Sequence, residues 1–303
     1  MPKDALIESI TAAMAKVVND EVVKGTPVEQ IKRSLKNINY YDLLNDAVGT
    51  TKDIHVANFK HIMFEKAIEM RAQNNEFLAH HEQIWWQGFV ASEAMYSIAL
   101  EIGELFGKYM SGLRGKRRNE RDQNSYKYLS LRELHVRSCQ VYMEILTLIE
   151  AGFADGAFAR WRTMFELSVI ANFLSSNNND VAKAFYEASN QDCGWHDWAK
   201  TAECFKESKK RISFDMLWNR CGLKTPEWTQ QYQMANKIVH ASPQGTFKRL
   251  AILNTPKSLC AGRSDYGVSV PAEHAAISLA STTASFLSIH TYGDGLVHSY
   301  CML

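Results

Sequence analysis

The chain has 303 residues, 46% of them apolar, with 34 Lys and Arg against 33 Asp and Glu. This composition excludes a disordered polyelectrolyte and is sufficient for a large buried core. The net charge of +1 excludes a protein whose whole surface binds nucleic acid, so any such surface is local. No apolar run has the length of a membrane span, and the first residues do not resemble a secretion signal. We therefore expect a cytoplasmic globular protein without membrane contacts.

Cysteine spacing and the absence of common motifs limit the chemistry further. The six cysteines are scattered without a Cys-x-x-Cys pair, which favours reduced thiols. The sequence has no phosphate-binding glycine loop, no dinucleotide fingerprint, no nucleophile elbow and no zinc helix. His80 and His81 are adjacent, so on a helix they point about 100° apart and do not chelate one ion together. We expect no metal and no cofactor.

Apolar residues at three- and four-residue spacing, together with only six prolines, predict an all-α protein. The first predicted helices cover residues 4–24, 27–36 and 40–48, and the second of these begins at a Thr-Pro pair. A boundary is expected near residues 50–53. Residues 1–75 are polar and are expected to form an N-terminal helical arm or subdomain, and a role in dimerisation and a place in the main bundle both stay open.

Residues 76–303 are expected to form a multi-helix bundle domain. Dense charge without apolar residues predicts an exposed loop over residues 114–122. Glycines and prolines predict one long irregular loop over residues 241–270, before the last helix. Helices are predicted over residues 59–110, 126–150, 155–174, 181–189, 196–210, 227–240 and 271–290.

Charged side chains occur inside the most apolar of these helices. Arg160, Arg162 and Glu166 lie within seven residues of a segment that must be buried, and buried charges are costly unless they are paired. Arg162 and Glu166 are an i, i+4 pair about 40° apart, whereas Arg160 points to roughly the opposite side. One interpretation is a structural ion pair that holds the bundle together. The other is an anion or phosphate site, because a guanidinium binds phosphate as a fork.

A second polar pattern lies on the helix predicted over residues 227–240. Tyr232, Asn236 and His240 follow one another at i, i+4 and i+8, so they line one helix face. His240 ends this helix, where the helix dipole favours its charged form and suits a proton donor or a phosphate partner. The alternative is a histidine that only caps the helix carbonyls.

These two segments, with the Gly-Arg-Ser-Asp-Tyr-Gly run at residues 262–267, resemble a bacterial helical family of unknown function over about residues 80–290. Its members distantly resemble the HEPN superfamily, whose active representatives are metal-independent ribonucleases of toxin–antitoxin and antiphage systems. Asn236 and His240 match half of the HEPN motif, but Ala235 stands at the place of its arginine. The resemblance therefore implies that Arg162 or Arg160 supplies the guanidinium.

The resemblance implies a metal-independent ribonuclease-like effector of a bacterial defence or toxin system that acts on RNA. In such a site a histidine is the general acid or base and an arginine stabilises the transition state. The expected catalytic residues are His240, Arg162, Arg160, Glu166 and Asn236. Because superfamily sites often form where two copies meet, a homodimer or another homo-oligomer is implied as well.

The basic stretch around residue 117 is expected to collect nucleic-acid phosphates by charge. Its expected contact residues are Arg114, Lys116, Arg117, Arg118 and Arg121. The alternative to an enzyme is a non-catalytic helical module that binds a protein, nucleotide or nucleic acid, including a partner protein of a defence system. A solvated loop without a ligand is the corresponding alternative for the basic stretch.

Overall fold

The structure is a computed structural model that describes residues 3–37, 39–191, 194–251, 261–290, 292–293 and 295–296, without the side chains of residues 3–6, 116, 120 and 121. These residues form eleven α-helices and two short 3-10 helices and contain no strand, which confirms the all-α prediction. None of the described helices has an apolar stretch sufficient to cross a bilayer. The chain divides into two compact units, Met1–Glu76 and Phe77–Leu303.

The first unit contains α1 (Lys3–Val23), α2 (Val28–Lys36) and the beginning of α3 (Tyr40–Gly112). The break expected at residues 50–53 is wrong, because α3 continues through them without interruption. The Thr51 hydroxyl, which is buried, donates to the Ala47 carbonyl at 2.7 Å. A threonine satisfied in this way stays inside a helix, so its polarity does not mark a boundary.

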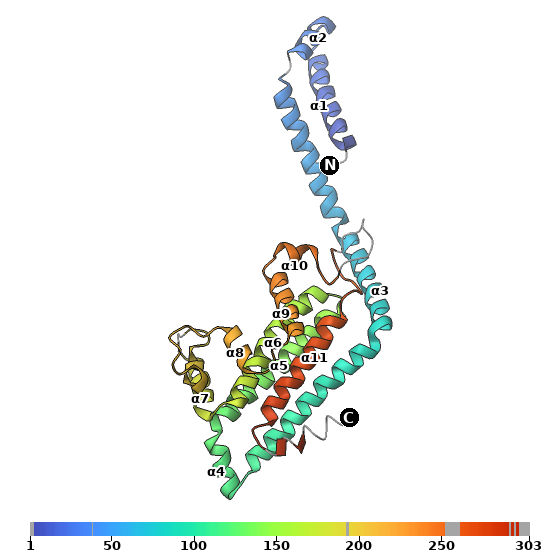
Figure 1. The fold of residues 1–303 in the computed structure, drawn as a ribbon. Coiled ribbons are helices and arrows are strands. Elements are labelled where there is room, and N and C mark those ends of the chain that lie inside the picture. The colour runs from blue at the N-terminus through green and yellow to red at the C-terminus, as the bar shows by residue number, and fades with distance from the viewer. Residues whose placement is uncertain are drawn as a thin grey trace. The chain divides into compact units, whose positions relative to one another are not determined.

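The core of the second unit lies among four helices. Figure 1 shows α5 (Ser125–Glu150), α6 (Ala154–Ser176) and α11 (Ser269–Leu287) side by side, with the second half of α3 along α11. Phe106 of α3 and Phe286 of α11 are fully buried and meet edge to face, with ring centroids 5.0 Å apart. Burial of such side chains removes apolar area from water and is the main favourable term in folding.

The remaining elements surround this core. Two predictions about them are wrong. Residues 114–122, expected to be a loop, include most of a helix, because Lys, Arg, Glu and Gln are good helix formers whatever their exposure. Residues 196–210, expected to be one helix, contain two short 3-10 helices because Ala202 between them is extended, with φ −70° and ψ 140°. The elements are α4 (Gly115–Gln123), α7 (Asn179–Ala188), η1 (Asp197–Thr201), η2 (Glu203–Phe205), α8 (Phe214–Arg220), α9 (Pro226–Val239) and α10 (Pro243–Phe247).

Helix α9 matches its prediction closely. Its N-cap is Thr225, whose side chain accepts from the Trp228 backbone N–H, and Pro226 occupies the first turn. The loop expected over residues 241–270 contains α10, and residues 252–260 of it lie outside the described part of the chain.

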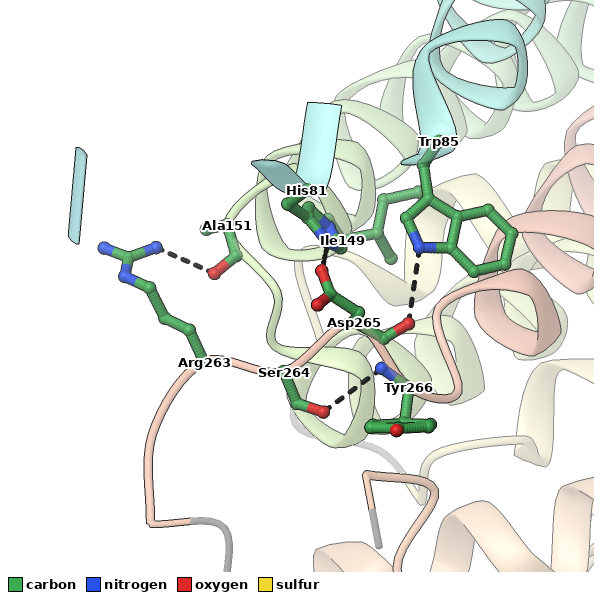
Figure 2. A network of polar contacts seen from close by, with 8 residues as sticks. All are labelled: His81, Trp85, Ile149, Ala151, Arg263, Ser264, Asp265 and Tyr266. Carbon is green, nitrogen blue, oxygen red and sulfur yellow. Dashed lines mark hydrogen bonds and ion pairs between the residues drawn. The ribbon is translucent and has the colours of Figure 1, made fainter. Parts of the chain in front are cut away.

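Residues 263–266, called the strap here, connect the bundle elements before α11 (Figure 2). The Arg263 guanidinium donates to the Ala151 carbonyl at 2.7 Å, and the Ser264 backbone N–H donates to the Gly152 carbonyl at 3.0 Å. Gly152 has a φ of +76°, which favours glycine at this turn between α5 and α6. The strap therefore fixes the α5–α6 turn from outside.

The strap also fixes α3 through a buried histidine. His81 Nδ1 lies 2.6 Å from Asp265 Oδ1, and His81 Nε2 lies 2.8 Å from the Ile149 carbonyl (Figure 2). The His81 side chain is fully buried, and both ring nitrogens are engaged. This histidine is therefore a structural cross-link between α3, α5 and the strap and has no nitrogen free for a metal ion.

A candidate polar site between α6 and α9

The predicted i, i+4 pair on α6 is present. Arg162 Nη2 lies 2.9 Å from Glu166 Oε1, and the two side chains are 28% and 30% exposed. The pair faces α9 at the edge of the core, where partial burial strengthens the attraction between the charges. Arg162 is therefore held in one place by its own helix.

Tyr232 of α9 completes this contact between the helices. Its hydroxyl donates to Glu166 Oε1 at 2.6 Å, and its ring centroid lies 5.7 Å from Arg162 Cζ. Burial raises the pKa of the Tyr232 hydroxyl, and the hydrogen bond to Glu166 raises it further. Tyr232 thus stays protonated and acts as a donor at neutral pH. Asn236 follows one turn later on the same face of α9.

His196 approaches the same carboxylate from the segment before η1. Burial lowers the pKa of His196, the Glu166 carboxylate opposes this shift, and Arg211 adds to it. The His196 ring lies 6.5 Å from the Phe214 ring, which in turn lies 5.2 Å from the Tyr232 ring. The lowered pKa favours the neutral form of His196, and a neutral imidazole is able to accept a proton.

Arg162, Asn236 and His196 each have one polar atom that is buried without a hydrogen-bond partner among the described residues, namely Arg162 Nε, Asn236 Oδ1 and His196 Nδ1. Trp218 Nε1 is a further such atom nearby, since the Trp218 ring lies 5.4 Å from the Tyr232 ring. Each unpaired buried group costs about 1–3 kcal/mol, so a network that served stability alone would be expected to pair them. We call the five residues Arg162, Glu166, His196, Tyr232 and Asn236 the polar cluster.

The structure separates Arg160 from the polar cluster. Its guanidinium forms an ion pair with Glu144 of α5, and Arg160 Nη1 lies 3.5 Å from the Thr163 hydroxyl. The two arginines thus point to different neighbouring helices, as the angular spacing predicted. Arg160 links α5 to α6, whereas Arg162 faces α9.

His240 ends α9 as its C-cap and is exposed. Its backbone N–H donates to the Asn236 carbonyl, but its imidazole makes no hydrogen bond or ion pair with the described residues. The helical rise places His240 about 6 Å beyond Asn236 and about 12 Å beyond Tyr232 along the axis. His240 therefore lies beyond the polar cluster at the C-terminal end of α9, against which α10 packs, and no hydrogen bond, ion pair or ring contact joins its side chain to the cluster among the described residues.

The basic residues of the predicted nucleic-acid contact lie on and beside α4. Arg114, Arg117 and Arg118 are exposed, and Arg118 Nε lies 3.8 Å from Asp122 Oδ2 one turn away. The side chains of Lys116 and Arg121 lie outside the described part of the structure. The described arginines are available to a ligand in solvent, and the helix orders them more than a loop does.

The comparison with protein families gives one match. Residues 128–256 match the family of unknown function DUF5677. The match covers less than half of the chain, but it includes all five residues of the polar cluster, and also Arg160 and His240. This family is described as one of unknown function, so the match assigns no function to these residues. Neither the curated proteins nor the solved structures contain a match to this chain.

Among the described residues, no group of three or more His, Cys, Asp or Glu side chains is arranged to hold a metal ion. Cys139, Cys204 and Cys221 are free thiols, and the other three cysteines lie outside the described residues.

Sequence reasoning missed His196 as a member of the cluster. It is far from α6 along the chain and lies in a segment without helical periodicity, so no spacing connects it with Glu166. By contrast, the i, i+4 spacing of Tyr232 and Asn236 predicts that the two side chains share one face of α9, which is the face of the polar cluster.

Proposed function

We propose that the second unit is a metal-independent ribonuclease-like effector that binds an RNA phosphodiester at the polar cluster. The observation that supports this most is the set of three buried, unpartnered polar atoms on Arg162, Asn236 and His196. A polar network kept at a cost in stability is typical of functional sites. Arg162 supplies the guanidinium that binds the phosphate, because Ala235 stands at the place of the arginine in the HEPN motif.

In the proposed reaction the ribose 2′-oxygen forms a bond to phosphorus and the bond from phosphorus to the 5′-oxygen breaks. His196, as the neutral imidazole, takes the proton of the 2′-hydroxyl. His240, at the C-terminal end of α9, gives a proton to the leaving 5′-oxygen. Arg162 stabilises the charge that develops on the phosphoryl oxygens. The products are a 2′,3′-cyclic phosphate and a 5′-hydroxyl, and no metal takes part.

Cleavage of RNA in the presence of a chelator tests this proposal. We expect the parent protein to cut labelled RNA and to leave 2′,3′-cyclic phosphate ends. His196→Ala and His240→Ala are each expected to slow cleavage about 100-fold or more, the usual contribution of a general acid or base. His61→Ala, which removes an exposed histidine of the first unit, is the matched control.

Unfolding curves of all variants separate loss of chemistry from loss of fold. If the folded parent leaves RNA intact, or if both histidine variants cut as fast as the parent, the ribonuclease proposal is wrong.

The second candidate function is a non-catalytic module that binds RNA or a nucleotide. The observation in its favour is that both interior arginines are ion-paired, Arg162 with Glu166 and Arg160 with Glu144. A paired guanidinium contributes less to a transition state than a free one. Binding of RNA without any cleavage in the same assay is the outcome that selects this module.

Helix α4 is the proposed second contact with RNA. Replacement of Arg114, Arg117 and Arg118 by serine is expected to reduce the salt dependence of RNA binding, because each lost phosphate contact lowers the slope of log K against log salt by about 0.7. The three substitutions together lower it by about 2. Fluorescence anisotropy of a 2′-O-methyl RNA, which the proposed reaction does not cleave, measures this slope.

A triple serine variant of Lys32, Arg33 and Lys36 removes the same charge from exposed positions of α2 and is the control. Equal slopes for the two triple variants contradict a specific role of α4.

A further inference from the structure

A cavity of about 400 Å³ lies within the second unit, between α3, α5 and the beginning of α11. Its wall is mostly apolar and includes Trp85, Phe89, Met95 and Ala272. Cavities of a few hundred Å³ with apolar walls and few polar groups are typical of sites for small organic molecules. The cavity shares no residue with the polar cluster.

One buried hydroxyl in this wall has no partner. Tyr142 is only 2% exposed, and its hydroxyl makes no hydrogen bond with the described residues. Burial raises the pKa of Tyr142, and the Ser92 side chain opposes this shift. An unpaired hydroxyl is costly in an apolar wall, and a ligand with a polar group offsets this cost.

The strap fixes the aromatic part of the wall. The Trp85 indole N–H donates to the Asp265 carbonyl at 3.3 Å, and Asp265 is itself held by the buried His81 (Figure 2). The chain then continues from the strap into Val268 and Ser269, which also line the cavity. The indole is therefore held in one orientation before any ligand arrives, which lowers the entropic cost of binding.

Carboxylates in and beside the cavity determine which sign of charge a ligand carries. Phe89 also lines a second pocket, which contains Glu82, Glu93 and Glu150. Burial raises the pKa of Glu150, and the neighbouring Glu93 and Glu82 raise it further. None of these three carboxylates has an ion-pair partner among the described residues. Their field, together with the Glu273 carboxylate in the wall of the first cavity, favours a cation and repels an anion.

We propose that this cavity binds a small aromatic amine that carries a hydroxyl group. Its ring lies against Trp85 and Phe89, its hydroxyl pairs with the Tyr142 hydroxyl, and its ammonium group faces the Glu273 carboxylate, which lines the cavity. An ammonium beside an aromatic face gains further attraction from the ring.

Calorimetric titration of the full chain with four related compounds tests this assignment. Tyramine has both polar groups, phenethylamine lacks the hydroxyl, tyrosol lacks the charge, and 3-(4-hydroxyphenyl)propanoate carries a negative charge. We expect tyramine to bind about fivefold more tightly than phenethylamine and than tyrosol, and the propanoate to bind most weakly. In Tyr142→Phe the difference between tyramine and phenethylamine disappears.

A filled cavity provides the structural control. Ala272→Leu places a larger side chain into the cavity and is expected to weaken tyramine binding about tenfold or more. Ala280→Leu makes the same exchange at an exposed position of α11 and leaves binding unchanged. Unfolding curves verify that both variants fold. No binding of tyramine to the parent, unchanged binding to Ala272→Leu, or equal binding of the propanoate and tyramine overturns the proposal.

Discussion

Replacement of Trp161 by alanine is expected to lower the free energy of unfolding by about 3–5 kcal/mol, as for other large-to-small changes in cores. Trp161 is fully buried on α6. Its ring stacks on Phe158, with centroids 5.0 Å apart, and on Trp228 of α9, with centroids 5.8 Å apart. Its indole N–H donates to the His274 carbonyl of α11 at 3.1 Å. The substitution thus removes contacts that join three helices, together with one hydrogen bond to α11.

Urea unfolding followed by circular dichroism measures this loss. Trp195→Ala is the matched control, because Trp195 is 83% exposed and its loss is expected to change stability by less than about 0.5 kcal/mol. Similar effects of the two substitutions contradict the placement of Trp161 at the centre of the core.

The free energy of unfolding is expected to decrease as the pH is lowered, because one buried histidine titrates differently in the folded and unfolded chain. Burial lowers the pKa of His135 from its ordinary value of 6.5 to about 4, and a hydrogen bond with the Ala99 carbonyl opposes this shift. Its Nε2 lies 3.2 Å from that carbonyl, and its Nδ1 lies 3.3 Å from the Thr283 hydroxyl. The neutral ring therefore donates through Nε2 and accepts through Nδ1.

The direction of the pH effect follows from this neutral state. Above pH 6.5 His135 is neutral in both the folded and the unfolded chain and has no effect. As the pH falls from 6.5 to about 4, only the unfolded chain takes up the proton, so stability is lost. At about 1.4 kcal/mol per pH unit the full loss is about 3 kcal/mol.

A comparison with His135→Gln isolates this contribution. Glutamine keeps a donor and an acceptor but does not titrate. Between neutral pH and pH 4, the free energy of unfolding of the variant is therefore expected to decrease by about 2–3 kcal/mol less than that of the parent. Other groups with altered pKa, such as His274, act in both proteins and cancel. If the unfolding free energies of the parent and of His135→Gln change equally with pH, His135 does not titrate in this way.

Close packing around His135 also explains a glycine that no pattern revealed. A Cβ at Gly103 of α3 would lie 2.6 Å from His135 Nε2, so the helix needs glycine there for the close approach of α5. In the sequence Gly103 stands in the middle of a helical pattern, where glycine is otherwise unfavourable. Glycine is needed at this position because of His135, which lies more than thirty residues away along the chain.

Local relations were predictable from the sequence. The Arg162–Glu166 pair follows from one helical turn, and the shared face of Tyr232 and Asn236 follows from another. Each depends on residues a few positions apart on one helix. Such relations are fixed by helix geometry alone.

Relations between distant segments were not predictable. His81 and Asp265 are separated by 184 positions, and no periodic pattern connects them. The run at residues 262–267 contributes to the family resemblance, but its role as a strap follows only from the fold. Charge density was misleading at α4, because it reports exposure and does not report whether the backbone is helical.

The central proposal is that RNA binds at Arg162, on the side of α6 that faces α9. Binding of a 2′-O-methyl RNA to Arg162→Gln and Arg160→Gln tests it most directly, because the two arginines lie two positions apart on one helix and both are ion-paired. We expect Arg162→Gln to weaken binding about tenfold, as for loss of a charged hydrogen bond, and Arg160→Gln to stay within about twofold of the parent. Equal affinities for the two variants, or no binding by the parent, contradict the proposal.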